Sequence, residues 1–318
     1  MDLYQKIGAL GIVPVLKLNA ADRAVPTCRA LARGGLPAAE ITFRTAAAAE
    51  SIRRVAAELP EVLVGAGTVL TTEQADQAIA AGAKFIVTPG FNEAVVRRCV
   101  DAGVPVIPGC PTTSDIERAL SLGITNVKFF PAETMGGAAA IKAISAPYSM
   151  VRFMPTGGVT ETNLNQYLAL PSVLACGGSW MAKDEMIDSG DWDKIEALTR
   201  AAVQKMLGFD LIHVGLNAGT AEEALSVARA FSALFGWPVK DGNSSAFAGT
   251  QVEVMKAGGR GKYGHLAVGC NSVARGRAYL EGLGFAFAPE TEKVVNGRPT
   301  IIYLRDEVAG FAVHLLQR

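Results

Sequence analysis

The sequence predicts an α/β protein in which a (β/α)8 TIM barrel over residues 1–207 is followed by a smaller α+β domain over residues 208–318. Two observations indicate the barrel. Eight short apolar strands alternate with helical segments at a spacing of roughly 20 to 30 residues, and no Gly-x-Gly-x-x-Gly motif opens a helix after the first strand. The missing motif disfavours the alternative, a doubly wound open sheet. The sequence after Gly208 differs from the part before it: it is richer in predicted strands and contains all 3 histidines. This change marks the domain boundary.

The expected barrel strands occupy residues 12–16, 39–44, 62–68, 85–90, 104–109, 126–133, 152–158 and 173–178. In such a barrel the active-site groups lie at the carboxyl ends of the strands, and period-two alternation decides which side chains point inward. On the second strand, Glu40, Thr42 and Arg44 share the inward face. On the sixth strand, Lys128 and Phe130 share it.

Composition limits the partners and the compartment. The 318 residues are 50% hydrophobic and carry 30 basic against 30 acidic side chains, so the zero net charge argues against nucleic acid or a membrane surface as partner. The first residues lack a basic stretch followed by an apolar one, and no apolar run approaches the roughly 18 residues of a membrane span, which predicts a cytoplasmic protein. The 5 cysteines are scattered without a Cys-x-x-Cys pair, so neither a disulfide frame nor a thiolate zinc site is indicated.

Lys128 is the residue on which the predicted Schiff-base chemistry depends. It stands in an apolar strand, where burial favours the neutral amine that condenses with a ketone to form a Schiff base. The alternative is a strand-end lysine that extends to water. Glu40 and Arg44 are suited to proton transfer and carboxylate binding, and the alternative for them is an interior ion pair that only fills space. Three threonines also lie at strand ends: Thr68, Thr88 and Thr156. Together with Lys128, Glu40 and Arg44, they make the open end of the predicted barrel suited to binding a keto acid.

Glycine pairs lie at the ends of the seventh and eighth strands. The seventh strand ends in Thr156, Gly157 and Gly158, and the eighth ends in Gly177, Gly178 and Ser179. Glycines let backbone N–H groups approach an anion closely, and the loops after these two strands are the recurrent phosphate site of the barrel fold. A pair of tight turns is the alternative. Two pairs at the two expected places predict a phosphorylated substrate.

The motifs of residues 1 to about 205 resemble those of the 2-keto-3-deoxy-6-phosphogluconate (KDPG) and 4-hydroxy-2-oxoglutarate (KHG) aldolases. They stand, in the order and spacing of that family, at residues 40–45, 65–70, 88–90, 128–133, 155–158 and 177–180. The resemblance implies a class I, Schiff-base aldolase that cleaves KDPG to pyruvate and D-glyceraldehyde 3-phosphate, and KHG to pyruvate and glyoxylate. It also implies a homotrimer that needs no metal for this chemistry.

The resemblance further implies that Lys128 is the Schiff-base lysine and Glu40 the general acid and base. The substrate-binding set that it implies is Arg44, Thr68, Pro89, Phe130, Thr156, Gly157, Gly158, Gly178 and Ser179. Of these, Arg44, Thr68 and Thr156 would hold the carboxylate, and the glycines with Ser179 would hold the phosphate.

Residues 208–318 contain an internal repeat. His213, a helix that ends near Trp237 and the strand 252–255 recur as His265, a helix that ends near Phe285 and the strand 313–316. Each half is predicted to be βαβββ, which resembles the glyoxalase-like (vicinal oxygen chelate) fold. By position, this resemblance implies a set of metal ligands, His213, Glu253, His265 and His314, the last standing where that fold usually has a glutamate.

Imidazole and carboxylate ligands without thiols suit zinc, nickel, iron or manganese. The alternative is that the histidines are remnants or hydrogen-bonded core groups of a domain that only packs against the barrel. Two functions therefore compete with the aldolase: a metal-dependent glyoxalase-like enzyme with the barrel secondary, and a non-catalytic phosphosugar sensor. Lys128 and Glu40 argue against the sensor, which needs neither an imine-forming amine nor a proton shuttle.

Overall fold

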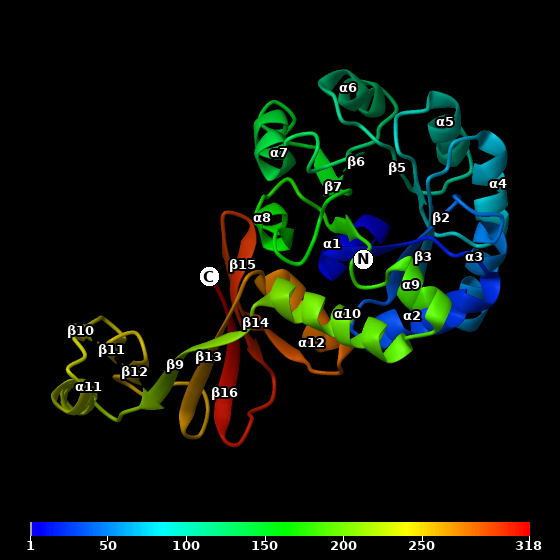
Figure 1. The fold of residues 1–318 in the computed structure, drawn as a ribbon. Coiled ribbons are helices and arrows are strands. Elements are labelled where there is room, and N and C mark those ends of the chain that lie inside the picture. The colour runs from blue at the N-terminus through cyan, green and yellow to red at the C-terminus, as the bar shows by residue number, and fades with distance from the viewer. Residues whose placement is uncertain (1) are drawn as a thin grey trace. The chain divides into compact units, whose positions relative to one another are not determined.

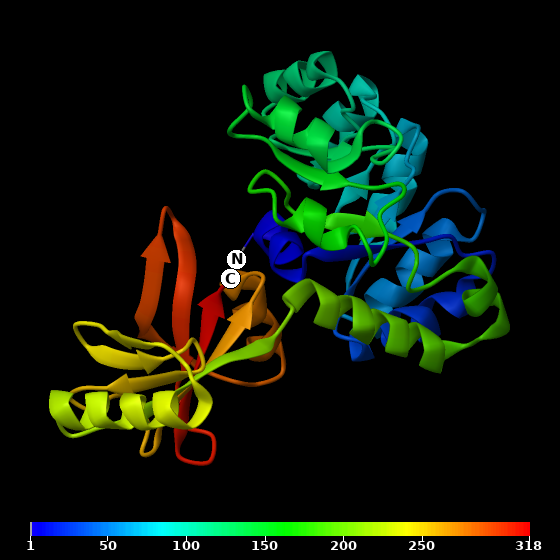
Figure 2. The ribbon, with the colours of Figure 1, turned by 60° about the vertical axis from the view of Figure 1, so that its left-hand side comes forward.

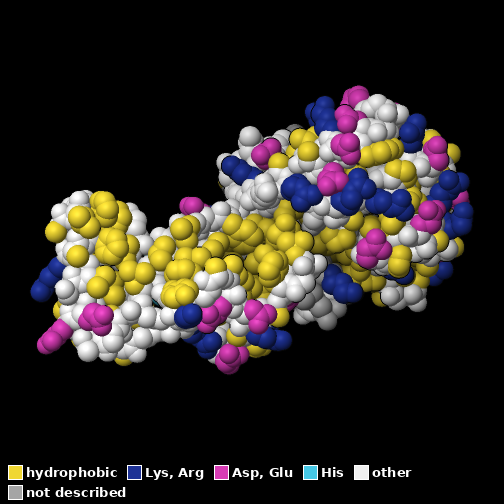
Figure 3. All heavy atoms as spheres, turned by 90° about the horizontal axis from the view of Figure 1, so that it is seen from below, with side chains coloured by type: hydrophobic (Ala, Val, Ile, Leu, Met, Phe, Trp, Pro, Cys, Tyr) yellow, Lys and Arg dark blue, Asp and Glu magenta, His cyan; other side chains and the backbone are white. Residues whose placement is uncertain are grey.

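A computed structural model describes residues 2–318, and Met1 lies outside the described residues. The chain divides into two compact units, Met1–Met206 and Leu207–Arg318 (Figure 1). Among residues 2–318, no helix is both long enough and apolar enough to cross a lipid bilayer. Basic and acidic side chains are interspersed on the face of the first unit drawn in Figure 3.

The first unit is a closed barrel of parallel strands. Six strands pair in the order β5-β4-β3-β2-β1-β8, and β6 pairs with β7. Isolated parallel bridges complete the ring: Gly109 pairs with Lys128 between β5 and β6, and Thr156 pairs with Gly177 between β7 and β8. The strands are β1 (Ile12–Leu16), β2 (Ala38–Thr42), β3 (Leu63–Gly67), β4 (Ile86–Val87), β5 (Val106–Ile107), β6 (Asn126–Phe129), β7 (Arg152–Pro155) and β8 (Cys176–Gly178).

Helices connect these strands around the outside of the barrel (Figure 1). Thr71, Asn92 and Thr112 each begin a helix by accepting a hydrogen bond from an otherwise unpaired N–H of its first turn. The helices are α1 (Leu3–Leu10), η1 (Ala21–Arg23), α2 (Ala24–Arg33), α3 (Ala48–Glu58), α4 (Thr72–Ala80), α5 (Glu93–Asp101), α6 (Thr113–Ser121), α7 (Gly137–Ser145), α8 (Leu164–Leu168), α9 (Asp184–Ser189) and α10 (Trp192–Leu207).

Helix α1 closes the amino-terminal end of the barrel. Its Ile7 is fully buried in one core with Val13 and Phe85, and Tyr4 donates a hydrogen bond to the carbonyl of Val106 at 3.3 Å. The Phe85 ring fits because Gly65 lies beside it, where a Cβ would overlap the ring. The carboxyl ends of the strands therefore form the end of the barrel that is left for a site.

β1 spans residues 12–16 as predicted, and the other seven barrel strands are shorter than predicted. β2 ends at Thr42, so Arg44 lies beyond the strand and not on its inward face as expected. β6 ends at Phe129, which places Phe130 in the following loop. β5 has only 2 residues because Pro108, which has no N–H to donate, follows it. Several predicted strand ends are therefore loops in the structure.

The second unit is a single eight-stranded sheet of two βαβββ modules, the repeat expected from the sequence. In each module the last strand pairs in parallel with the first, and the two first strands pair antiparallel, giving the order β10-β11-β12-β9-β13-β16-β15-β14. The elements are β9 (Asp210–Asn217), α11 (Ala221–Phe235), β10 (Val239–Asp241), β11 (Ser245–Ala248) and β12 (Val252–Met255), then β13 (Gly264–Cys270), α12 (Val273–Gly282), β14 (Phe287–Val295), β15 (Arg298–Leu304) and β16 (Phe311–Gln317).

Side-chain alternation separates the two faces of this sheet. Val252 and Val254 pack in the core beneath α11, which lies along β10, β11 and β12 in Figure 2, so Glu253 between them faces the other way. Leu315 packs in the core beneath α12, so its neighbour His314 also points away from the helix. One face is therefore apolar and covered by helices, and the opposite face carries polar side chains.

Candidate functional sites

Lys128 and Glu40 meet inside the barrel. The Nζ atom of Lys128 lies 3.2 Å from Oε1 of Glu40, although β6 and β2 are far apart in the sequence. The lysine side chain is 6% exposed and the glutamate side chain 0%, so water competes little for either group. The ring centroid of Phe130 lies 5.4 Å from the same amine. The Lys128 amine and the Glu40 carboxylate thus lie in contact in the barrel interior, where both are almost fully shielded from solvent.

The place of Glu40 depends on a glycine of the next strand. β2 and β3 pair in parallel, with Glu40 opposite Gly65 and Thr42 opposite Gly67. A Cβ at Gly67 would overlap the Glu40 carboxylate, so glycine is needed there. The second carboxylate oxygen, Oε2, is buried and has no hydrogen-bond partner among residues 2–318. Glu40 therefore keeps one oxygen on the lysine and one for a substrate or a water molecule.

Arg44, Thr68 and Thr156 lie at the carboxyl ends of their strands. The Nε of Arg44 donates to Oγ1 of Thr42 at 3.1 Å, so this exposed guanidinium stays at the end of β2. Thr156 is 7% exposed, and its hydroxyl has no partner within the described chain. Thr68 is half-buried and has φ 53, a rare value for a β-branched residue. Strained backbone at a strand end is typical of functional sites.

Thr88, by contrast, has a structural task. Its hydroxyl donates to the carbonyl of Gly90 at 2.6 Å and accepts from the N–H of Gly109 at 3.3 Å. A Cβ at Gly109 would overlap the Pro89 carbonyl, so the loops after β4 and β5 are packed closely there. Thr88 therefore fixes the loop that carries Pro89.

The glycine pair after β7 has the geometry of an anion site. Gly157 and Gly158 have φ 92 and 82, values that favour glycine. Their N–H groups have no hydrogen-bond acceptor among residues 2–318. Gly157 also lies against the Phe130 ring, because a Cβ there would come within 3.2 Å of it. Ser179 is exposed directly after β8. Backbone donors are thus available beside the amine and carboxylate pair.

The structure adds residues that the sequence does not single out. Trp180 lies against Gly178, where a Cβ would overlap its ring, and its buried indole N–H has no acceptor among residues 2–318. Glu133 and Tyr167 hydrogen-bond to each other, and a Cβ at Gly158 would come within 2.5 Å of Glu133 Cγ. Glu133 and Trp180 fall within the motifs 128–133 and 177–180, but only their side-chain positions reveal them.

The four residues predicted as metal ligands converge on the helix-free face of the second sheet. The Nε2 atoms of His213 and His265 are 3.1 Å apart, and Oε2 of Glu253 lies 3.2 Å from the first and 3.1 Å from the second. His213, His265 and His314 can each contribute a ring nitrogen to a group whose members all lie within 4.8 Å of one another. The four residues come from β9, β12, β13 and β16, the first and last strands of the two modules.

The shifted pKa values of His314 and Glu253 favour the forms of these side chains that bind a cation. His314 is 4% exposed, and neither ring nitrogen has a hydrogen-bond partner among residues 2–318. Burial, together with the neighbouring His265 and His213, lowers the pKa of His314 to about 4. Burial alone would raise the pKa of Glu253, but hydrogen bonds from His213, His265 and Ser245 hold it well below its usual value. A neutral imidazole and an ionised carboxylate are the forms that bind metals.

Further side chains surround the cluster. Ser245 donates to Oε1 of Glu253 at 2.6 Å and so leaves Oε2 for the histidines. Phe247 meets His213 edge-on, with centroids 6.0 Å apart, and Tyr303 stacks on His314 at 4.6 Å. The two aromatic residues hold equivalent places, because Phe247 pairs across the sheet with Glu253 and Tyr303 pairs with His314.

Comparison with known proteins identifies the first unit. The family model described as KDPG and KHG aldolase matches residues 4–198. The chain belongs to the KDPG and KHG aldolase family. It is 50% identical over 204 residues to a 2-dehydro-3-deoxy-phosphogluconate aldolase of Treponema pallidum, which covers 64% of this chain and 97% of that relative. It is 43% identical over 193 residues to the KHG/KDPG aldolase of Escherichia coli K12, which covers 61% of this chain and 91% of that relative.

Solved aldolase structures share the fold. The KDPG aldolase of Legionella pneumophila, described with pyruvate captured as a covalent carbinolamine intermediate, has a TM-score of 0.61 and 35% identity and covers 63% of this chain and 98% of its own. The KDPG aldolase of Zymomonas mobilis ZM4 with 3-phosphoglycerate has a TM-score of 0.58 and 38% identity and covers 64% and 95%. The family member described here is thus an aldolase, a carbon–carbon lyase of the Schiff-base type.

Proposed function

We propose that this aldolase uses Lys128 as its Schiff-base amine and Glu40 as its proton shuttle. It cleaves 2-dehydro-3-deoxy-6-phosphogluconate to pyruvate and D-glyceraldehyde 3-phosphate, and 4-hydroxy-2-oxoglutarate to pyruvate and glyoxylate. The observation that carries the assignment is the 3.2 Å approach of the Lys128 amine to a Glu40 carboxylate that is fully buried. An imine-forming amine needs a neighbouring group that both gives and accepts protons, and this carboxylate is suitably placed.

The reaction follows from these two side chains. The neutral Lys128 amine attacks the C2 ketone, and Glu40 gives the proton with which the carbinolamine hydroxyl leaves as water. The protonated imine then accepts the electron pair of the C3–C4 bond as the C4 hydroxyl loses its proton to Glu40, and the aldehyde departs. Protonation of the enamine carbon and hydrolysis of the imine release pyruvate and regenerate the amine. No metal ion takes part in these steps.

The binding groups divide by charge. Arg44, Thr68 and Thr156 hold the carboxylate of the substrate through a guanidinium and hydroxyl groups. The phosphate lies against the loops after β7 and β8, where the unpaired N–H groups of Gly157 and Gly158 support an anion site together with Gly178 and Ser179. Pro89 and Phe130 line the space between these two ends. A homotrimer and a cytoplasmic location, both expected from the sequence, belong to the same proposal.

Borohydride trapping tests the aldolase assignment. Borohydride added with pyruvate reduces the imine to a stable secondary amine, so we expect irreversible inactivation and a pyruvate-derived mass on the peptide that contains Lys128. Lys128→Arg keeps the charge but cannot form the imine, and it should abolish both labelling and turnover. Lys142→Arg, an exposed lysine on α7, is the control. Label on another lysine would refute the assignment.

The second unit is proposed to be a glyoxalase-like (vicinal oxygen chelate) module that holds one divalent metal ion. The convergence of His213, Glu253 and His265, together with the two unpaired nitrogens of buried His314, supports this reading over a set of satisfied core histidines. Imidazole and carboxylate donors fit zinc, nickel, iron or manganese. When bound, such an ion supplies a Lewis acid that polarises a ligand oxygen.

The protein's own residues prepare this site. Ser245 orients the Glu253 carboxylate, and burial keeps His314 neutral. Titration of the metal-stripped full chain with Mn²⁺ should show close to one ion per chain, and Glu253→Gln should weaken that binding by at least tenfold. Glu223→Gln, an exposed carboxylate on α11, is the control. Equal binding by the Glu253 and Glu223 variants would make the cluster a structural core.

A further inference from the structure

The two modules differ beside the metal cluster. The first module presents Phe247 and the second presents Tyr303 at the equivalent place. Arg260 adds a charge to the tyrosine side, because its guanidinium carbon lies over the Tyr303 ring, 5.4 Å from the centroid. No such cation lies over Phe247 among residues 2–318. The site therefore has one apolar flank and one cationic flank.

Hydrogen bonds to the backbone on both sides of Arg260 fix the position of its main chain. It belongs to the glycine-rich segment 256–263 that joins β12 to β13. The Asn217 side-chain amide donates to the carbonyl of Gly259 at 3.4 Å and to that of Gly261 at 2.9 Å, one on each side of Arg260. Gly261 has φ 84, and a Cβ there would overlap the Gly264 carbonyl. The segment thus follows a defined path past the cluster.

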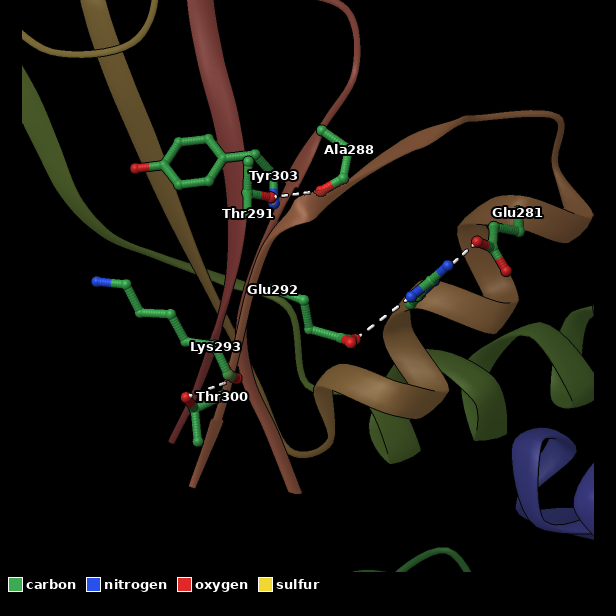
Figure 4. A network of polar contacts seen from close by, with 8 residues as sticks. Glu281, Ala288, Thr291, Glu292, Lys293, Thr300 and Tyr303 are labelled. Carbon is green, nitrogen blue, oxygen red and sulfur yellow. Dashed lines mark hydrogen bonds and ion pairs between the residues drawn. The ribbon is translucent and has the colours of Figure 1, made fainter. Parts of the chain in front are cut away.

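Tyr303 is positioned from β14. The Thr291 hydroxyl donates to the carbonyl of Ala288 at 2.7 Å and accepts from the N–H of Tyr303 at 3.0 Å, across an irregularity in the pairing of β14 with β15 (Figure 4). In the same view the Tyr303 ring points away from α12, whereas Glu292 points towards it. This orientation puts the ring on the face that carries the metal cluster.

Of the two cations of this segment that form ion pairs, Arg260 is more open to a ligand than Lys256. Lys256 is occupied by Asp241 and by the carbonyl of Gly242 at 2.6 Å. Within residues 2–318, Arg260 has an ion pair only with Glu290, at 3.7 Å, and both side chains are more than half exposed. Ion pairs of that kind contribute little because water and salt screen them. A ligand acid group at the cluster can therefore displace Glu290 at small cost.

The charge of the proposed set of metal ligands also favours an anionic ligand. Three neutral imidazoles and one carboxylate leave a divalent ion with a net charge of about +1, and Arg260 adds another positive charge on one side. We infer that the second unit binds a small carboxylate ligand, whose acid group pairs with Arg260 beside Tyr303. This inference rests on the metal site proposed above.

The test uses the full chain loaded with Mn²⁺ and oxalate as the probe. Oxalate has no ketone, so it cannot form an imine with Lys128. Its binding is read from the loss of water-proton relaxation enhancement as it displaces water from Mn²⁺. The neutral diamide oxamide is the uncharged control ligand. Lys262→Gln is the matched control for Arg260→Gln, because Lys262 lies in the same segment and contacts Tyr263 instead.

We expect Arg260→Gln to weaken oxalate binding by about tenfold or more, the size of a lost charge-assisted hydrogen bond, with Mn²⁺ affinity and oxamide binding unchanged. Lys262→Gln should bind oxalate within about twofold of the unaltered chain. Equal oxalate affinity in the two variants, on chains that bind Mn²⁺ normally, would overturn this inference alone. A chain that binds no Mn²⁺ at all would overturn the metal site and this inference with it.

Discussion

At the scale of single residues, the two carboxylate oxygens of Glu40 differ in their contacts. The Glu40 side chain is fully buried, yet among residues 2–318 only its Oε1 has a partner, the Lys128 amine. Leaving a buried carboxylate oxygen without a hydrogen bond costs free energy of folding. A protein that only needed an interior ion pair would gain from pairing both oxygens. The unpaired Oε2 therefore indicates a place for a substrate hydroxyl or a catalytic water molecule.

Replacing this carboxylate tests its role. Glu40→Gln keeps the shape but cannot shuttle a proton, so we expect kcat to fall by about 10² to 10⁴ with a smaller change in KM. Steady-state kinetics on KDPG measure both constants. Glu50→Gln, an acidic residue on α3 outside the site, should leave them unchanged. A kcat that survives Glu40→Gln would assign the proton transfer to another group.

A charge at Ser179 tests the phosphate loops. Ser179→Glu places a carboxylate beside the proposed phosphate, and like charges a few ångströms apart cost about one to a few kcal/mol. We expect KM for KDPG to rise by about tenfold or more, while cleavage of unphosphorylated KHG is spared. Ser149→Glu, exposed before β7, is the control. Equal losses on both substrates would argue against a phosphate site at Ser179.

Some of these residues are predictable from the sequence and others are not. Period two predicts that Glu40 and Lys128 face each other, because both positions lie on regular strands. Arg44 lies past the end of its strand, so alternation does not apply to it, and only its bond to Thr42 shows where it is held. Ser245 is a generic polar residue in the sequence, because its partner Glu253 depends on strand register.

At the scale of elements, the barrel site depends on pairs of neighbouring strands. The carboxylate on β2 needs the glycine on β3, and the hydroxyl of Thr156 after β7 needs Gly177 on β8, where a Cβ would overlap it. The rhythm of strands and helices predicts the barrel, but it does not predict which glycines make room for site side chains. That information lies in the register, such as the pairing of Thr42 with Gly67.

Adding one methyl group tests this dependence. Gly67→Ala brings a Cβ into the Glu40 carboxylate, so the carboxylate must move from the Lys128 amine. We expect kcat to fall by at least tenfold and stability to fall by about 1 to 3 kcal/mol, as for other overpacked cores. Kinetics and denaturant unfolding measure these effects. Gly282→Ala, where no atom lies within 4 Å of the added Cβ, should change neither. Unaltered kinetics in Gly67→Ala would show that Glu40 tolerates displacement.

At the scale of the whole molecule, two units place two clusters of ionisable side chains in one chain. The barrel forms its site from side chains on different strands of a parallel ring, and the second sheet forms its cluster where the first and last strands of two modules meet. The repeat in the sequence is sufficient to predict that meeting, since equivalent strands carry His213, Glu253, His265 and His314. The place of Arg260 over the Tyr303 ring is not predictable from the repeat, because it depends on the path of segment 256–263.

Metal removal should separate the two units. The proposed ion binds the folded second unit and not the unfolded chain, so at about 100 times its dissociation constant it adds about 2.7 kcal/mol to stability. We therefore expect chelation to lower the melting temperature of the second unit in calorimetry of the full chain, and Glu253→Gln to remove that difference. The rate of KDPG cleavage should be the same before and after chelation, because the imine chemistry of Lys128 uses no metal. Cleavage that stops on chelation and returns with Mn²⁺ would instead make the aldolase itself dependent on the metal.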